Sequence, residues 1–289
     1  MTEIIESLDE VAGAYRALFV DLWGCLHDGV RALPPAVAAL QRFRAGGGRV
    51  VLLTNAPRPR AEVAKQIAGL GVPDDAWDVI VTSGDAARVA LFRGAVGSRV
   101  WHIGEARDEG FFVPPRIVDR PAEISRVPLD EAEGIACTGP FDPHAPPETL
   151  RGELLLAKTR GLPMLCANPD IVVDRGESRE YCAGAIARLY EEMGGHALYF
   201  GKPHPPIYDL ARTRLGAIGP VADDAILCIG DGLHTDIAGA SGEGLDALFV
   251  TGGLEREATG TTRQPDPSAL ARVLDTARLS PRYAIGALC

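Results

Sequence analysis

Short apolar runs alternate with longer amphipathic segments in the N-terminal part of the chain. The runs 17–22, 49–55 and 79–82 are rich in Val, Leu, Ile and Phe, and each ends in small or polar residues. Such runs are typical of strands buried on both faces of a parallel sheet. Segments with helical spacing predict helices at 34–44, 60–70 and 84–92, and a short amphipathic helix at 3–14. Strands that alternate with helices in this way predict an α/β fold with a parallel sheet.

The alternation becomes irregular between residues 99 and 195, where the runs are shorter and proline is frequent. Here we expect strands at 99–103, 134–137 and 163–167 and helices at 147–160 and 180–193. The first pattern then returns, with strands at 197–200, 225–230 and 247–250 and helices at 205–215, 235–241 and 266–278. We therefore predict a core domain, residues 1–82 and 197–289, that carries an inserted α/β domain, residues 83–196.

Composition and charge exclude several classes of partner. The chain has 289 residues, of which 46% are hydrophobic, and a formal net charge of −10. Without a basic run, such a chain is not expected to bind nucleic acid or an anionic membrane surface. No window approaches the roughly 18 apolar residues of a membrane span, and the acidic segment 1–10 does not resemble a signal peptide. Six cysteines without C-x-x-C spacing indicate reduced, mostly buried thiols, so we expect a cytoplasmic protein.

Polar side chains that suit phosphate chemistry follow four of the predicted strands. They are Asp21, Thr54 with Asn55, Lys202, and Asp231 with Asp236. Each is weak evidence alone, because Asp, Asn and Thr are common in turns and helix caps. However, the carboxyl ends of parallel strands meet at one edge of a sheet, and open α/β folds bind ligands there. We therefore expect all of these residues along one edge of a single sheet, where they form one site.

The chemistry that needs this set is phosphoryl transfer. A carboxylate such as Asp21 attacks phosphorus and forms an aspartyl-phosphate. Mg²⁺ prefers hard oxygen ligands, and Asp21 and Asp231 supply two carboxylates. Lys202 supplies a fixed positive charge, while Thr54 and Asn55, with nearby backbone N–H groups, are expected to hold phosphate oxygens.

With these residues in this order, the sequence resembles the haloacid dehalogenase-like hydrolases of class IIA, which include sugar-phosphate, nucleotide and pyridoxal-phosphate phosphatases. The resemblance covers nearly the whole chain, and the matching positions are Asp21, Thr54, Gly201-Lys202-Pro203, Asp231 and Asp236. Residues 82–85 match the point where the chain of the family leaves the core toward the cap, and Asn168-Pro169-Asp170 matches a motif of the cap. The resemblance implies a Rossmann-like core with a large inserted α/β cap.

The resemblance also implies roles for individual residues. Asp21 is the expected nucleophile, and Lys202 assists it. The expected Mg²⁺ ligands are Asp21, Asp231 and the backbone carbonyl of Trp23, with Asp236 supporting them. In the cap, Asn168 and Asp170 are expected to face the substrate, and Asp174 is a further candidate.

Trp23 departs from the pattern of the family, which has a second Asp two residues after the nucleophile. The backbone carbonyl of Trp23 still suits a metal ion, but an indole cannot protonate a leaving group or activate water. General acid–base catalysis contributes about 10²–10⁴-fold to the rate. We therefore expect an intact metal and phosphate site together with incomplete hydrolytic machinery.

Three explanations for Trp23 stay open. Another residue replaces the missing acid, with His27, Asp28, Asp142 and His144 as candidates, although each is more commonly a turn residue. Alternatively, the substrate has a good leaving group, or the chain is a phospho-ligand-binding or regulatory protein with little turnover. We expect a Mg²⁺-dependent phosphatase that acts on a small phosphorylated metabolite resembling a sugar phosphate. The substrate itself, and whether the chain forms a homodimer, are not decided by the sequence.

Overall fold

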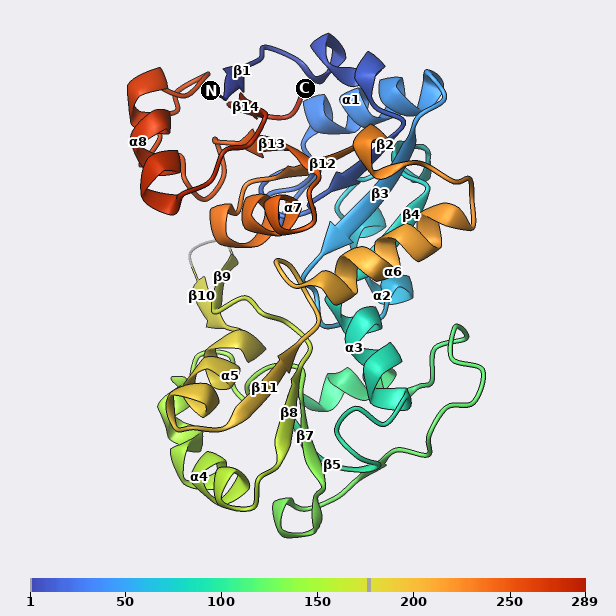
Figure 1. Cartoon of the computed structure of the whole chain (residues 1–289), viewed down its shortest axis with the longest axis vertical. Coiled ribbons are helices and arrows are strands. Elements are labelled where there is room, and N and C mark those ends of the chain that lie inside the picture. Colours follow the sequence, from blue (N-terminus) through green and yellow to red (C-terminus); the bar gives the residue numbers. More distant parts are fainter. Residues whose placement is uncertain (1, 176–177) are drawn as a thin grey trace. The chain divides into compact units, whose positions relative to one another are not determined.

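The computed structural model describes residues 2–175 and 178–289, which group into two compact units (Figure 1). The first unit holds the chain up to Thr54 together with Ala64–Val81 and Tyr208–Cys289. The second unit holds Asn55–Val63 and Thr82–Ile207. Each unit has a parallel sheet of its own, as expected for an α/β protein.

A seven-stranded sheet forms the centre of the first unit. Its strands lie in the order β1 (Glu3–Ile4), β14 (Tyr283–Ile285), β13 (Asp246–Val250), β12 (Ile226–Gly230), β2 (Ala17–Val20), β3 (Arg49–Thr54) and β4 (Val79–Thr82). The strand pairs from β1 to β3 are all parallel. Every residue of β2 and β12 is buried, which agrees with the apolar runs that predicted them.

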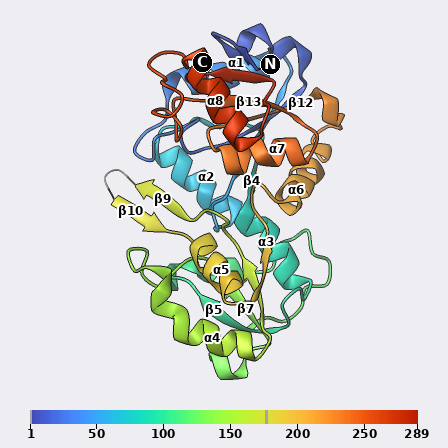
Figure 2. The ribbon, with the colours of Figure 1, turned by 60° about the vertical axis from the view of Figure 1, so that its left-hand side comes forward.

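Most helices of the first unit lie close to their predicted ranges, and α7 is shorter than expected. They are α1 (Pro34–Ala45), α7 (Ala238–Gly242) and α8 (Pro267–Ala277), with most of α2 (Arg60–Gly69) and α6 (Pro205–Gly216). Prolines occupy the first turn of α1, where no backbone donor is needed, and Asp266 caps α8 by accepting from the N–H of Ala269 at 2.8 Å. Helix α7 packs on β13 (Figure 2). Shorter helical turns are Leu8–Glu10, Ala12–Ala14, Asp74–Ala76, Asp223–Ala225 and the wide turn Leu233–Ile237, which occupies part of the helix expected at 235–241.

The helix expected at 3–14 is absent, and the prediction was wrong there. The segment forms strand β1 and two 3₁₀ turns instead. Strand β1 pairs with β14 from the other end of the chain, with Ile4 opposite Ala284. A strand partner this distant leaves no local pattern, and a segment this short has little helical stability of its own.

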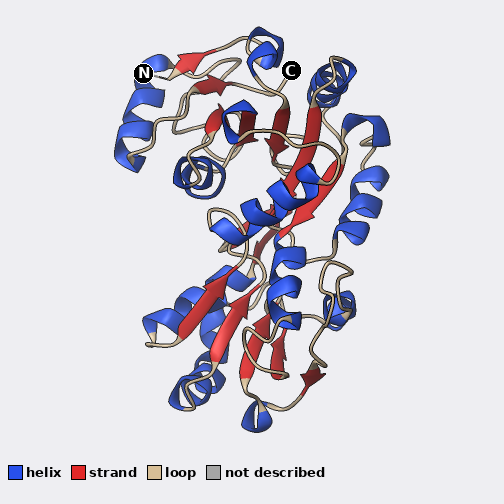
Figure 3. Ribbon diagram, turned by 45° about the vertical axis from the view of Figure 1, so that its right-hand side comes forward, coloured by secondary structure: helices blue, strands red, loops and turns tan. Residues whose placement is uncertain are grey.

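The second unit contains a five-stranded parallel sheet, whose strands appear as red arrows in Figure 3. Their order is β11 (His196–Tyr199), β8 (Pro163–Cys166), β7 (Gly134–Cys137), β5 (Arg99–Ile103) and β6 (Ser125–Arg126). The helices are α3 (Ser83–Phe92), α4 (Arg151–Thr159) and α5 (Ala183–Glu192), with 3₁₀ turns at Ala106–Phe112, Leu129–Glu131 and Pro147–Leu150. One face of the sheet, with Ile135 and Met164, packs against Leu154 of α4 and Ile186 and Tyr190 of α5.

Two features of the second unit differ from the predicted elements. The strand expected at 197–200 in the first sheet is β11, which pairs with β8, so that Ala197 lies opposite Met164. A βαβ rhythm shows that strands are parallel but does not show which sheet they join. An antiparallel hairpin of β9 (Val172–Arg175) and β10 (Ser178–Tyr181) was not expected, and the helix predicted at 180–193 begins only after it.

Two further observations concern membrane-spanning helices and the cysteines. No helix within the described ranges has both the length and the apolar composition needed to cross a membrane. None of the six cysteines forms a disulfide, and five of them are buried, as their apolar surroundings in the sequence predicted.

Candidate active site

Three of the predicted site residues follow neighbouring strands of the first sheet. Strand β2 lies between β12 and β3, so their carboxyl ends bring Asp21, Asp231 and Thr54 to one edge. The backbone N–H of Asp21 donates to the carbonyl of Ile229 at 2.8 Å, which extends the pairing of β2 and β12 by one residue. All three polar side chains are buried, with 8% of Asp21 and 4% of Asp231 exposed. Water is thus largely excluded from two carboxylates, and buried charges of this kind are paired or coordinate a metal ion.

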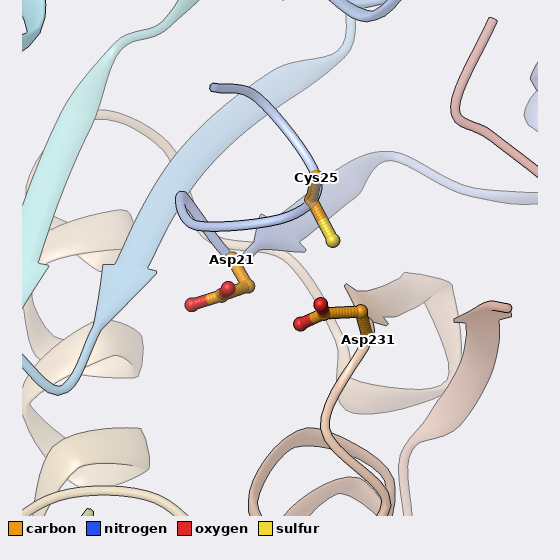
Figure 4. A group of neighbouring side chains, drawn as sticks. All are labelled: Asp21, Cys25 and Asp231. Carbon is orange, nitrogen blue, oxygen red and sulfur yellow. The ribbon is translucent and has the colours of Figure 1, made fainter. Parts of the chain in front are cut away.

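Asp21 and Asp231 come together with a thiol that the sequence analysis did not single out. One oxygen of each carboxylate and the sulfur of Cys25 all lie within 4.8 Å of one another (Figure 4). The two carboxylates supply the hard oxygen ligands that Mg²⁺ prefers. The signal that was missed is a ligand-type side chain four positions after the expected nucleophile, on the same loop.

Two glycines allow the chain to approach the carboxylate of Asp231. Gly24 has a φ of +76°, and a Cβ at this residue would lie 2.1 Å from Oδ2 of Asp231. A Cβ at Gly253 would lie 2.0 Å from the same oxygen. The backbone N–H of Leu254 donates to it at 3.0 Å. The carboxylate is therefore held in place by backbone on two sides, and no larger residue fits at either glycine without moving it.

Asp236 supports the loop that carries Asp231. Its Oδ2 accepts from the N–H of Gly232 at 3.1 Å and from the hydroxyl of Thr235 at 3.4 Å. A Cβ at Gly230 would lie 2.2 Å from the Cβ of Asp236, so the two residues pack closely. These contacts suit the supporting role that was expected for Asp236, because they shape the turn directly after β12.

Trp23 packs within its own loop. The indole meets the ring of His27 edge-on at 5.3 Å between centroids, and a Cβ at Gly29 would lie 2.5 Å from it. His27 is buried, and its Nδ1 accepts from the N–H of Gly29 at 3.1 Å. Burial lowers the pKa of His27, so its ring is neutral near pH 7. The indole is therefore packed within this loop as an apolar group.

The acids considered as substitutes lie in turns. Oδ1 of Asp28 accepts from the backbone N–H groups of Val30 and Arg31 at 2.9 and 2.8 Å. The N–H of Arg31 and then that of Val30 lower the pKa of Asp28, so this carboxyl is a poor proton donor at neutral pH. Oδ1 of Asp142 likewise accepts from the N–H of His144 at 2.9 Å, and both residues are exposed. These contacts are those of ordinary turn residues.

The remaining predicted site residues belong to the second unit, which corrects the expectation of a single sheet edge. Lys202 follows β11 of the second sheet, and Asn168 follows β8, the neighbour of β11. Lys202 is 3% exposed. The expectation failed because β11 joins the second sheet, and a residue at the end of a strand lies at the edge of the sheet that the strand joins. Lys202 is therefore not on the sheet edge that carries Asp21 and Asp231.

Asn55 ties these residues of the second unit together. Its Oδ1 accepts from the N–H of Lys202 at 2.7 Å, and its Nδ2 donates to the carbonyl of Lys202 at 3.0 Å. Nδ2 also donates to Oδ1 of Asp170 at 2.8 Å, and the N–H of Asp170 donates to Oδ1 of Asn168 at 2.9 Å. Both amide hydrogens of Asn55 thus go to protein oxygens. Asn55 was expected to bind phosphate, which stays a prediction, and its side-chain amide contacts Lys202 and Asp170.

Residues 82–85, expected where the chain leaves the core, begin α3. The hydroxyl of Thr82 accepts from the N–H of Asp85 at 2.9 Å and so caps the helix. The hydroxyl of Ser83 donates to the carbonyls of Ala167 at 2.6 Å and Ala56 at 3.1 Å. These bonds join the start of α3 to the segments that carry Asn55 and Asn168. The side chain of Asp174 lies outside the described part of the chain.

Two family models match parts of the chain, and several known proteins are similar to it. Residues 18–112 match the family model described as haloacid dehalogenase-like hydrolase, and residues 199–277 match one described as HAD-hydrolase-like. A glycerol phosphate phosphatase from Mycobacterium tuberculosis, crystallised in complex with calcium, is 25% identical with a TM-score of 0.64 and covers 84% of this chain and 68% of its own. The D-glycerol 3-phosphate phosphatase of Mycobacterium tuberculosis (strain ATCC 25618 / H37Rv) is 28% identical over 255 residues, 86% of this chain. This chain spans 66% of the length of that enzyme.

A closer likeness extends over the full length. The solved structure of a haloacid dehalogenase-like hydrolase from Brucella suis 1330 has a TM-score of 0.85 and covers 99% of this chain and 100% of its own. Its sequence is 39% identical to this one. The chain therefore belongs to the haloacid dehalogenase-like hydrolase family.

Proposed function

We propose that the protein is a phosphatase that hydrolyses a small phosphorylated metabolite and depends on Mg²⁺. The observation that carries this proposal is the pair of buried carboxylates, Asp21 and Asp231, at the ends of adjacent strands. The phosphatases among the similar proteins support it, including two described as acting on glycerol phosphate. The inserted segment, approximately residues 83–196, is proposed to be a cap that sets specificity through Asn168 and Asp170.

The metal site of this proposal consists of Asp21, Asp231 and the backbone carbonyl of Trp23, with Asp236 holding the loop. The donor set fits Mg²⁺, because buried carboxylate oxygens are the hard ligands that it prefers. When bound, the ion neutralises negative charge on the phosphate and lowers its repulsion from Asp21. Lys202 supplies a second, fixed positive charge, and the Thr54 hydroxyl donates to a phosphate oxygen.

The reaction proceeds in two displacements at phosphorus. An oxygen of Asp21 forms a bond to phosphorus, and the bond from phosphorus to the ester oxygen breaks, which leaves an aspartyl-phosphate and an alkoxide or aryloxide. Water then attacks phosphorus, the bond to Asp21 breaks, and phosphate leaves while a proton passes to solvent. Trp23 can neither protonate the leaving oxygen nor accept the proton of water. The mechanism therefore favours substrates whose leaving oxygen is stable as an anion.

Trp23 also favours a second candidate function on the same fold. A packed indole at the place of the acid is compatible with a protein that binds a phosphorylated ligand and turns it over slowly or not at all. The two functions share the metal and phosphate site, and they differ in how fast the bound phosphoester is hydrolysed. Only the rate of turnover separates them.

A panel of phosphoesters with Mg²⁺ tests the proposal. Inorganic phosphate release is expected from the wild type and from Asp130→Asn, an exposed carboxyl in the second unit that serves as the matched control. Asp21→Asn is expected to abolish release. Mg²⁺-dependent ligand binding without release from any substrate would contradict the phosphatase and support the binding protein.

A further inference from the structure

The buried grouping at the end of β2 has a mixed set of donors. The sulfur of Cys25 lies within 4.8 Å of one oxygen each of Asp21 and Asp231, and Figure 4 shows the thiol directed toward Asp231. Cys25 is 1% exposed. Within the described ranges, this is the one grouping of three such ligand-type side chains. An oxygen-only site for Mg²⁺ has no need of a sulfur at this position.

The loop between Asp21 and Cys25 has a defined shape that holds the thiol there. The N–H of Gly24 donates to the carbonyl of His27 at 2.9 Å, and the N–H of Leu26 donates to the carbonyl of Leu22 at 2.8 Å. Gly24 itself lies against the carboxylate of Asp231. Two backbone hydrogen bonds and one close approach therefore place the residue after Gly24 beside both carboxylates.

The spacing of the donors suits a single ion of zinc-like size. Zinc binds sulfur at about 2.3 Å and carboxylate oxygen at about 2.0–2.2 Å in tetrahedral geometry, so the sulfur and an oxygen bound to one ion lie about 3.6 Å apart. The three donors lie within 4.8 Å of one another. Binding of one ion by all three therefore requires the side chains to rotate toward one another.

Sulfur changes which cation the site prefers. Thiolates favour softer cations such as Zn²⁺, Cd²⁺ and Co²⁺, whereas carboxylates alone suit Mg²⁺. We propose that Asp21, Cys25 and Asp231 bind a thiophilic divalent cation of the Zn²⁺ type more tightly than they bind Mg²⁺, with the sulfur of Cys25 as a direct ligand. The thiol proton passes to solvent when the ion binds. This inference shares its carboxylates with the metal site of the proposed function, but it does not depend on turnover.

Co²⁺ is the probe, because a thiolate bound to Co²⁺ gives a charge-transfer absorption band that oxygen ligands do not give. The full chain is expected to show this band at one equivalent of Co²⁺, and Zn²⁺ is expected to remove it at a far lower concentration than Mg²⁺. In Cys25→Ser and Cys25→Val the band is expected to disappear and the affinity for Zn²⁺ to fall at least tenfold. Losses of about 10–100-fold follow even from changes outside the direct ligands.

Two further variants locate the site. Cys289→Ser removes the one cysteine that is not buried and is expected to keep the band, whereas Asp231→Asn is expected to lose it. Absence of the band in the folded wild type, its persistence in both Cys25 variants, or its loss in Cys289→Ser would overturn the inference. A protein with the Cys25-dependent band and no phosphatase activity would refute the proposed function alone. Activity with Mg²⁺ and no band would refute this inference alone.

Discussion

The side-chain amide of Asn55 holds the backbone of Lys202 at both its N–H and its carbonyl, at 2.7 and 3.0 Å. Asn55 is the residue directly after β3, and Lys202 follows β11. The amide of Asn55 thus bonds the N–H and the carbonyl of one residue, as the backbone of a neighbouring strand does in a sheet. The position of the lysine that the proposed reaction uses therefore depends on an asparagine as well as on the lysine's own strand.

Asn55→Ala is expected to destabilise the protein and to lower kcat. Each buried backbone group of Lys202 left without a partner costs about 1–3 kcal/mol of unfolding free energy. Unfolding in urea measures this cost, and Gln41→Ala is the control, because the hydrogen bond from Gln41 to Asp75 is exposed. If Asn55 binds phosphate instead, the variant would keep its stability and lose affinity for inorganic phosphate.

Trp23 is expected to make turnover depend on the leaving group. Without an acid, the wild type should cleave aryl phosphates faster than alkyl phosphates by an amount of the order of the ~10²–10⁴-fold that acid catalysis supplies. Trp23→Asp should recover part of the alkyl rate. Trp23→Asn is the matched control, because it leaves the same void beside His27 and Gly29 without supplying an acid.

Two results would show that this account of Trp23 is mistaken. One is equal and fast turnover of both substrate classes by the wild type. The other is equal recovery of the alkyl rate in Trp23→Asp and Trp23→Asn. A loss of alkyl turnover on changing His27, Asp28, Asp142 or His144 would identify that residue as the substitute acid.

Gly253→Ala is expected to weaken Mg²⁺ binding. The added methyl would lie 2.0 Å from Oδ2 of Asp231, so the carboxylate must move. Overpacking of this kind typically costs about 1–3 kcal/mol of stability. The Mg²⁺ concentration for half-maximal activity and the unfolding free energy measure the two effects. Gly242→Ala is the control, since nothing lies within 4 Å of its Cβ position; similar effects in both variants would argue against the close approach to Asp231.

His102 is expected to make the protein less stable in acid. Burial, together with the charge of Arg126, lowers the pKa of His102, while Asp108 opposes the shift. Its Nε2 lies 2.9 Å from the hydroxyl of Thr138. A His whose folded pKa lies below its unfolded value binds fewer protons when folded, so its contribution to stability is present above the unfolded pKa. That contribution is lost as the pH falls through the folded pKa.

The measurement is the unfolding free energy between pH 7.5 and about pH 5, starting above the unfolded pKa of about 6.5. The wild type and His144→Gln, a change at an exposed histidine, should lose stability more steeply toward acid than His102→Gln. Equal slopes in all three proteins would exclude His102 as a source of the acid sensitivity.

The local pattern of the sequence was sufficient to predict those strands and helices that form for local reasons. Buried strands such as β2, β3 and β12 follow from continuous apolar runs, and α1 follows from prolines at its start and glycines at its end. Because β2, β3 and β12 are neighbours in one parallel sheet, the sequence also placed Asp21, Thr54 and Asp231 together at its edge. The chemistry expected of these residues followed from their side-chain types.

Tertiary structure alone decided what depends on partners distant in the chain. The segment of β1 became a strand because β14 pairs with it, and β11 joined the second sheet because β8 is its partner, which moved Lys202 with it. The contacts of Asn55 were also decided by the fold, since its amide meets Lys202 and Asp170 only in the folded chain. Cys25 came beside two carboxylates because a turn at Gly24 reverses the chain against Asp231. Such contacts join residues far apart in sequence, so the periodicity of one segment does not predict them.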